Sequence, residues 1–175
     1  MPVFNIILKA EGWECVAAVR PSEGRYWALK CRCLSCHEVT DNYLFIDSKE
    51  SYQSSGGGVR NYVSKCHFCK ESVTANVVVA PPSSGMSHKN SNRSVPSLGS
   101  YNPEQHSEGG AVVQLDMRGA EPVELRLDDQ WVVEGMSGVV FKDADLSEDW
   151  YEYDETARST VSISGVSVSF HRVKK

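Results

Sequence analysis

The stretch AVVQLDMRGAEPVELRLD, residues 111–128, decides the fold class of this 175-residue chain. Apolar residues occupy every second position in its two halves: Val113, Leu115 and Met117, then Val123, Leu125 and Leu127. Successive side chains of a β-strand point to opposite faces of a sheet, so a period of two is the pattern of a half-buried strand. The stretch therefore predicts two such strands, at 111–118 and 122–127.

Short runs rich in Val, Ile, Phe, Tyr and Trp recur along the rest of the chain and predict further strands. These lie at 3–10, 13–19, 25–33, 39–46, 59–65, 72–80, 130–134, 138–142 and 161–172. In the last of them the apolar face shifts by one residue, which predicts a β-bulge at Gly165. Only residues 143–160 could host a helical turn. We therefore expect an all-β protein, built as two β lobes or as one sandwich or barrel-like body.

A segment with few large apolar side chains divides the chain into two parts. Residues 81–110 are rich in Ser, Pro and Gly, and this composition cannot offset the entropy lost on ordering. We predict a flexible insertion there. It separates an amino-terminal part, 1–80, which holds all six cysteines, from a carboxy-terminal part, 111–175, which holds none. We expect these two parts to pack as one unit.

Composition excludes several classes of function. The chain is 41% hydrophobic and 23% charged, with a formal net charge of -5, so it lacks the basic surface of a general nucleic-acid or anionic-membrane binder. No apolar run reaches the roughly 18 residues of a membrane helix. The opening MPVFNIILKA does not resemble a secretory signal, so we expect the cytoplasm. In that reducing setting, six cysteines indicate metal or redox chemistry before disulfides.

Two CxxC motifs carry the main functional signal. Cys33-Leu-Ser-Cys36 and Cys66-His-Phe-Cys69 are separated by 29 residues. Each motif can close a tight turn with both sulfurs on one side, and two such turns supply the four thiolates of a tetrahedral zinc site. The spacing predicts one Zn²⁺ per chain, held by Cys33, Cys36, Cys66 and Cys69.

A single CxxC is also the thioredoxin redox motif, in which the first thiolate lies at the start of a helix. Here both motifs are followed by strand-forming sequence, as in EVTDNYLFI after Cys36 and SVTANVVV after Cys69. Zinc has no redox chemistry, and four protein ligands leave no position for a water molecule. These points favour a structural zinc site, while redox or disulfide chemistry at the same cysteines stays open as the alternative.

Other candidate residues have plainer interpretations. Cys31 shares a strand face with Cys33, either as a neighbour of the metal or as a buried apolar residue, and Cys15 is expected in the core. His37 and His67 lie beside or inside the motifs and are interpreted as exposed polar residues.

Two further segments are candidate binding or catalytic sites. Residues 56–58, three glycines, lack the Lys-Ser/Thr ending of a phosphate-binding loop, so a hairpin tip is favoured. Residues 143–155 interleave carboxylates with Trp150, Tyr151 and Tyr153 and could form a partner-binding strip or, less plausibly, a hydrolase site. A solvated loop anchored by its aromatic residues is the default interpretation.

A set of motifs spread over about nine-tenths of the chain resembles one known family. They are Leu8-Lys9-Ala10, Val19-Arg20-Pro21, Trp27-x-Leu29, Cys33-x-x-Cys36-x-Glu38, Lys65-Cys66-x-x-Cys69, Arg118-Gly119-x-Glu121-Pro122-Val123, Glu134-Gly135 and Asp149-Trp150-x-x-Tyr153-Asp154-Glu155. Their order and spacing are similar to those of the eukaryotic CXXC-motif-containing zinc-binding proteins, an uncharacterised conserved family. The resemblance implies an all-β protein with one zinc at the four motif cysteines, no established enzymatic activity, and a cytoplasmic or nuclear location. The serine-rich stretch near 81–100 and Cys31 depart from the family pattern.

Two hypotheses of different classes follow. In the first, the chain is a non-enzymatic protein whose zinc clamps two hairpin tips and fixes a surface for a protein partner. In the second, the same cysteines make it a thiol-based metal-handling or redox protein. We expect neither nucleic acid nor membrane as a partner.

Overall fold

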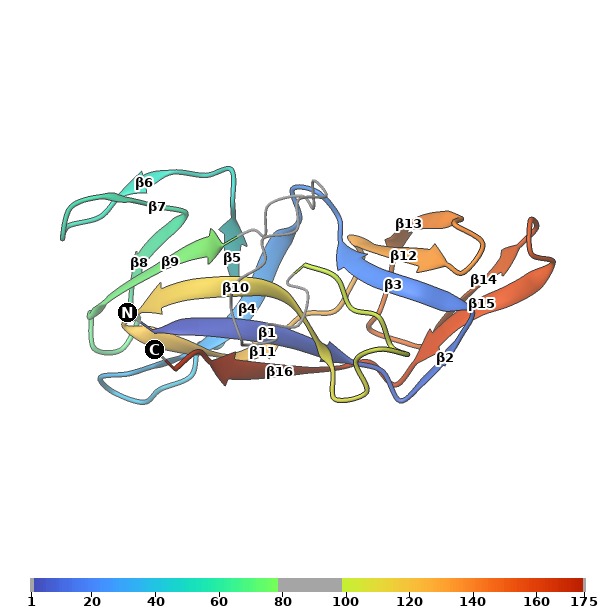
Figure 1. Ribbon diagram of the computed structural model, residues 1–175. Helices are drawn as coiled ribbons and strands as arrows, with labels where there is room; N and C mark the ends of the chain where they lie inside the picture. Colours follow the sequence, from blue (N-terminus) through green and yellow to red (C-terminus); the bar gives the residue numbers. More distant parts are fainter. Residues whose placement is uncertain (1, 79–98, 175) are drawn as a thin grey trace.

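The computed structural model describes residues 2–78 and 99–174, which form strands and connecting loops without any helix (Figure 1). The strands are β1 (Val3–Lys9), β2 (Gly12–Glu14), β3 (Val16–Pro21), β4 (Tyr26–Cys33), β5 (Leu44–Asp47), β6 (Tyr52–Gln53), β7 (Val59–Arg60), β8 (Tyr62–Lys65), β9 (Ser72–Val78), β10 (Gly110–Arg118), β11 (Ala120–Leu125), β12 (Trp131–Gly135), β13 (Val140–Ala144), β14 (Trp150–Asp154), β15 (Ser159–Ser164) and β16 (Ser167–Arg172). The expectation of an all-β protein is confirmed. Residues 143–160, the one segment that could host a helical turn, form none, because Trp150, Tyr151 and Tyr153 lie in β14.

The largest sheet has five antiparallel strands in the order β16-β1-β10-β9-β8. It joins the two ends of the sequence, because Ile6 of β1 pairs with Val113 of β10 on one side and with Phe170 of β16 on the other. Ile6 is fully buried, and burying one such side chain stabilises the fold by about 1.5–3 kcal/mol. β10 is the strand expected from the alternation at 111–118.

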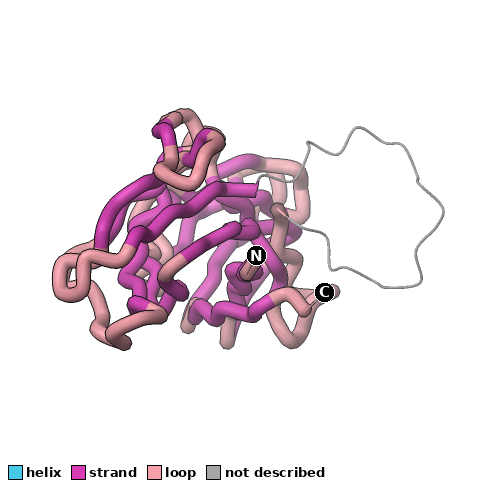
Figure 2. Tube along the Cα trace, turned by 90° about the vertical axis from the view of Figure 1, so that its left-hand side faces the viewer, coloured by secondary structure: helices cyan, strands magenta, loops and turns pink. Residues whose placement is uncertain are grey.

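Smaller antiparallel sheets complete the body, in the orders β11-β4-β5, β13-β12-β3, β14-β15-β2 and β6-β7. Viewed from the side, the strands surround a common interior (Figure 2). Its buried side chains come from both parts of the chain, as where Trp27 of β4 meets Trp131 of β12 edge to face, with ring centroids 6.1 Å apart. Within the described residues, no helix has the length and apolar character needed to cross a membrane.

Gly119 makes the sharp change of direction between β10 and β11. Its φ is +80°, and a Cβ atom built there would lie 2.1 Å from the carbonyl oxygen of Ser72. A side chain therefore cannot be accommodated, and the position requires glycine. The alternating stretch thus becomes two strands in different sheets.

The structure divides two predicted strands. Residues 13–19 are interrupted at Cys15, which has a φ of +55° and is half-buried rather than in the core. Residues 161–172 are interrupted at Gly165, whose φ is +61°. The predicted bulge is instead a corner, where the chain leaves the β14-β15-β2 sheet as β15 and joins the largest sheet as β16. The strand predicted at 39–46 is also shorter than expected at its start, because β5 begins only at Leu44.

The end of the predicted insertion is packed against the body. Residues 81–98 of that prediction lie outside the described residues, but Tyr101 is 1% exposed. Its backbone exchanges two hydrogen bonds with Val19, of 2.7 and 2.8 Å, and its hydroxyl accepts the backbone N–H of Ala10 at 3.0 Å. One buried aromatic side chain therefore anchors residues 99–110 to the body. The flexibility of the insertion stays a prediction.

Candidate metal centre

The four motif cysteines converge on one point. Cys33 ends β4 and Cys66 follows β8, and the turn after each strand brings back the second cysteine of its motif. The Cys33 and Cys69 sulfurs are 3.6 Å apart, the Cys36 and Cys66 sulfurs are 3.7 Å apart, and all four lie within 4.8 Å of one another. The structure therefore brings together the four residues that the motif spacing selected.

The first turn is held by backbone hydrogen bonds. The N–H of Cys33 donates to the carbonyl of Glu38 at 2.9 Å, and the N–H of His37 donates to the carbonyl of Cys33 at 3.0 Å. His37 has a φ of +63°, the left-handed conformation that reverses the chain directly after Cys36.

The second turn repeats this geometry residue for residue. The N–H of Cys66 donates to the carbonyl of Glu71 at 2.8 Å, the N–H of Lys70 donates to the carbonyl of Cys66 at 3.0 Å, and Lys70 has a φ of +65°. Both turns therefore share the pattern Cys-x-x-Cys-x-Glu, with a left-handed residue before the glutamate. The motif spacing identified the cysteines, but neither His37 nor Lys70 is glycine or asparagine, so the left-handed positions carried no sequence signal.

Sulfur geometry fits zinc. With a Zn–S bond of about 2.3 Å, the edges of a tetrahedron of sulfurs are about 3.8 Å long, close to the two shortest separations above. A disulfide needs about 2.05 Å between its sulfurs, and all six cysteines are free. The donor set, four sulfurs without a carboxylate or imidazole, is that of a structural zinc site.

Electrostatics of the cluster also point to a cation. Backbone N–H groups of Cys69 and Phe68 lower the pKa of the Cys66 thiol to about 7. A backbone hydrogen bond at Glu38 also lowers the pKa of the Cys36 thiol. Burial and the neighbouring thiols together have the larger, opposite effect and raise this pKa to about 12. One thiolate thus forms readily while the next resists ionisation, and a divalent ion among the sulfurs removes that resistance.

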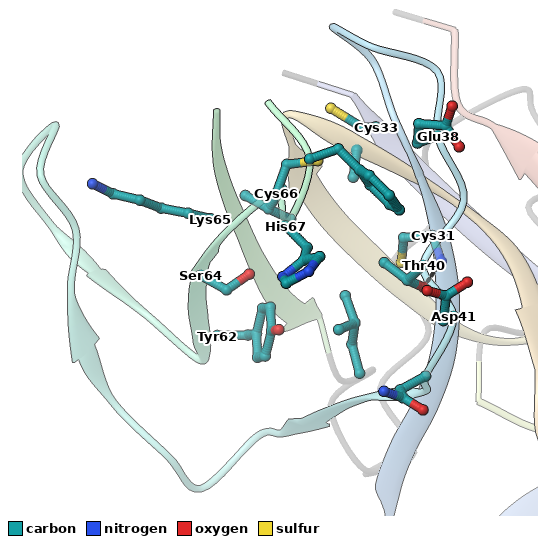
Figure 3. Close-up of a pocket in the computed structure, with 15 residues that line it drawn as sticks. Cys31, Cys33, Glu38, Thr40, Asp41, Tyr62, Ser64, Lys65, Cys66 and His67 are labelled. Atoms are coloured by element: carbon teal, nitrogen blue, oxygen red, sulfur yellow. Dashed lines mark hydrogen bonds between the residues drawn. The ribbon is translucent and has the colours of Figure 1, made fainter. Parts of the chain in front are cut away.

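A cavity of about 280 Å³ lies beside the sulfur cluster (Figure 3). In Figure 3, Cys31, Thr40 and Asp41 come from one wall and Tyr62 and Ser64 from the other.

Cys31 is 1% exposed and stands outside the four-sulfur cluster, and burial raises the pKa of its thiol to about 12. It is therefore a buried, protonated thiol beside the site. His37 and His67 contribute no ligand atom to the cluster and are exposed.

The remaining sequence candidates do not form a second site. Residues 56–58 are the tip of the β6–β7 hairpin, closed by a 3.1 Å hydrogen bond from the N–H of Ser54 to the carbonyl of Gly58. Asp154 is 1% exposed and accepts hydrogen bonds from the Ser137 hydroxyl and from two backbone N–H groups of its own turn. These contacts give Asp154 a structural role, and residues 143–155 line neither the cavity beside the sulfur cluster nor the larger cavity beside Arg25.

The comparison with protein families matches residues 5–171 to the family described as CXXC motif containing zinc binding protein, eukaryotic. The chain belongs to this family. Together with the four-cysteine cluster, the match makes it a zinc-binding protein. The resemblance carried by the motif order is confirmed.

Individual relatives align with this chain along nearly their whole length. A CXXC motif containing zinc binding protein of Bos taurus is 33% identical over 161 residues, covering 90% of this chain and 91% of the relative. A UPF0587 protein of Nematostella vectensis is 32% identical over 165 residues, covering 93% and 87%.

Solved structures share the same fold. The crystal structure of C1orf123 has a TM-score of 0.79 at 28% identity, covering 98% of this chain and 99% of that one. A hypothetical protein from Plasmodium falciparum has a TM-score of 0.77 at 18% identity, covering 98% and 100%, and shows the fold alone.

Proposed function

We propose that this chain is a non-enzymatic protein that holds one structural Zn²⁺ with Cys33, Cys36, Cys66 and Cys69, and that the metal fixes a surface for a protein partner. The observation that carries the proposal is the convergence of four sulfurs, within 4.8 Å, from two turns of the same geometry. Four thiolates satisfy a tetrahedral ion completely, so no coordination position remains for a reacting water molecule.

A structural role follows from where the two turns begin. β4 belongs to the β11-β4-β5 sheet and β8 is the edge strand of the five-stranded sheet. An ion held by both turns therefore cross-links two sheets at positions 30 or more residues apart in the sequence. Because a site of this kind forms only in the folded chain, its binding free energy contributes to folding.

The exposed apolar residues on the two turns support a binding surface. Leu34 is 45% exposed and Phe68 is 49% exposed, each between the two cysteines of its motif. Their position relative to each other depends on the ion that joins the turns. A partner protein with an apolar patch would therefore bind the zinc-loaded chain.

The structural role is tested by chelation. We expect a chromogenic chelator to take up one equivalent of zinc slowly. Tertiary structure at the sulfur end should be lost at the same rate, as measured by near-ultraviolet circular dichroism. Cys33→Ser should purify with less than one equivalent of zinc. A chain whose two cysteine turns keep their structure after complete zinc removal would contradict the structural role.

Metal exchange is the alternative function, and one observation favours it. Cys36, Cys66 and Cys69 are only half-buried, so a competing thiol can reach them. In that case zinc would leave quickly and without unfolding, and the free thiols would react rapidly with a disulfide reagent. The same chelation experiment therefore separates the two functions.

The partner surface is tested separately from the metal. We expect Leu34→Ser and Phe68→Ser to keep zinc and thermal stability. The partner proteins that cross-link to the turns of the unchanged chain, as identified by mass spectrometry, should be missing from both variants. Tyr151→Ser, which changes an exposed aromatic residue of β14, serves as the matched control. If all three variants recover the same cross-linked proteins as the unchanged chain, the turns are not the partner surface.

A further inference from the structure

A second cavity, of about 520 Å³, lies away from the sulfur cluster. Its walls come from the turn between β3 and β4, from Ser48 and Lys49 after β5, and from β9 and β10. None of the four cluster cysteines lines it. Its volume is within the range of about 300–1,000 Å³ typical of small-molecule sites.

The side chain of Arg25 is the unusual feature of this cavity. Arg25 is 3% exposed, and its guanidinium lies over the Trp131 ring at 4.2 Å and within 5.2 Å of the Trp27 ring centroid. Its Nη1 and Nη2 atoms donate to the backbone carbonyls of Asp129 and Arg126, at 2.7 and 3.1 Å. Carbonyls and aromatic rings orient the guanidinium, but they carry no full negative charge.

The charge of Arg25 is poorly compensated. Its nearest ion pair is with Asp128, at 4.0 Å, and Asp128 is shared with the Nε atom of Arg126 at 2.5 Å. Burial is the main cause that lowers the pKa of Arg25, to about 10, although the carboxylates of Asp128 and Asp129 act to raise it, so the group stays charged at neutral pH. A buried cation with a distant, shared counter-ion is costly, and a second anion close to it would be stabilising.

Two buried N–H groups lack an acceptor: one belongs to Arg25, which lines the cavity, and the other to Trp131, whose ring lies under the Arg25 guanidinium but does not line the cavity. The Nε atom of Arg25 and the Nε1 atom of Trp131 are both buried and have no hydrogen-bond partner among the described residues. A buried donor without an acceptor costs about 1–3 kcal/mol. Both groups are donors only, so what they require is an acceptor oxygen.

The lining of the cavity has the opposite charge to the chain as a whole. Arg20, Arg25 and Lys49 line it together with one carboxylate, Glu23, although the formal net charge of the protein is -5. Arg20 is paired with Glu134 at 3.1 Å, whereas Lys49 makes no ion pair with any described residue. A local excess of positive charge in a cavity concentrates anions there.

We propose that this cavity binds a small organic oxyanion, a carboxylate or a phosphate monoester, through Arg25 and Lys49. The lining of the cavity also includes Val77, Val112 and Val113, which suits a ligand with an apolar body. Arginine is well matched to oxyanions because its donors are planar and permanently charged. This site is independent of the zinc proposal.

The test uses the zinc-loaded full chain and follows the Arg25 Nε–H and Trp131 Nε1–H resonances by ¹H–¹⁵N NMR. The probes are benzoate, phenyl phosphate and neutral benzamide, all added at constant ionic strength. We expect saturable shifts of one or both resonances with at least one anion, and none with benzamide. Comparing benzoate with phenyl phosphate shows which oxyanion the site prefers.

Matched variants identify the site. Lys49→Gln should weaken binding of the preferred anion by about fivefold, the effect of removing one partly exposed charge. Lys142→Gln makes the same chemical change on β13, outside the cavity, and should leave the affinity unchanged. Absence of a saturable shift with either anion, equal shifts with benzamide, or equal losses in the two variants would overturn the proposal and assign the two donors to buried water.

Discussion

The two ends of the molecule stabilise their turns in different ways (Figure 1). At one end, the turns after β4 and β8 bring four thiols together within 4.8 Å, and we propose that a zinc ion stabilises this cluster. At the other end, the turn between β14 and β15 is held by the carboxylate of Asp154, which accepts the N–H groups of Thr156 at 2.9 Å and Ala157 at 3.1 Å. In this proposal the first end depends on a metal, whereas the turn at the second end is held by hydrogen bonds between its own donors and acceptor.

Under this proposal, the stability of the protein depends on zinc at one end only. Zinc availability should affect the sulfur end and leave the β14–β15 end almost unchanged. A surface at the sulfur end can therefore be present or absent according to the metal, without unfolding of the remaining sheets.

Zinc removal should have the largest effect. We expect chelation to reduce amide hydrogen-exchange protection at residues 62–73 by about a hundredfold, equivalent to about 2.8 kcal/mol. Protection at residues 150–163 should change by less than about threefold. A uniform loss of protection along both regions would show that the two ends are not separate.

Loss of one sulfur should have the next largest effect. Cys66→Ser removes a proposed ligand, and we expect a loss of about 3 kcal/mol, seen as a decrease in Tm of about 6–12 °C. Cys15→Ser is the matched control, since Cys15 is half-buried but lies outside the sulfur cluster. Its Tm should stay within about 3 °C of the unchanged chain, and an equal decrease in both variants would contradict a special role for Cys66.

Much of this account could be predicted from the sequence, because the signals were local. Alternation at 111–118 predicted β10, and the spacing of two CxxC motifs predicted the sulfur cluster. The corner at Gly165 could not be predicted, since a shift of the apolar face looks the same for a bulge and for a change of sheet. Likewise, Tyr101 lay in a polar segment, and its burial depends on Val19, which is distant in the sequence.

Backbone conformation at Lys70 should have a smaller effect. Lys70 has a φ of +65°, where a β-branched side chain is strained and glycine is not. We expect Lys70→Val to lower the free energy of unfolding by about 1–2 kcal/mol and Lys70→Gly to leave it equal or slightly higher, by urea denaturation with zinc present. Equal stability of the two variants would show that the turn does not need the left-handed conformation.

The smallest expected effect is the contribution of Asp154 to the pH dependence of stability. The Ser137 hydroxyl and the backbone N–H groups of Ala157 and Thr156 hold the pKa of Asp154 below its ordinary value of 3.8. Its stabilising contribution is therefore complete above that value and is lost as the pH falls through the lowered pKa.

Asp154→Asn should therefore be less stable than the unchanged chain at pH 6, and the difference in Tm should shrink as the pH falls below about 3.8. Zinc released in acid affects both chains alike, so the difference isolates Asp154. A difference that stays constant from pH 6 to pH 2 would assign the effect to packing rather than to the charge.

Zinc K-edge X-ray absorption on the purified full chain tests the central claim most directly. The account predicts one zinc per chain with four sulfur neighbours at about 2.3 Å, reduced to three sulfurs or to no bound metal in Cys66→Ser. A zinc ion with nitrogen or oxygen ligands in the unchanged chain, or an unaltered four-sulfur spectrum in the variant, would contradict it.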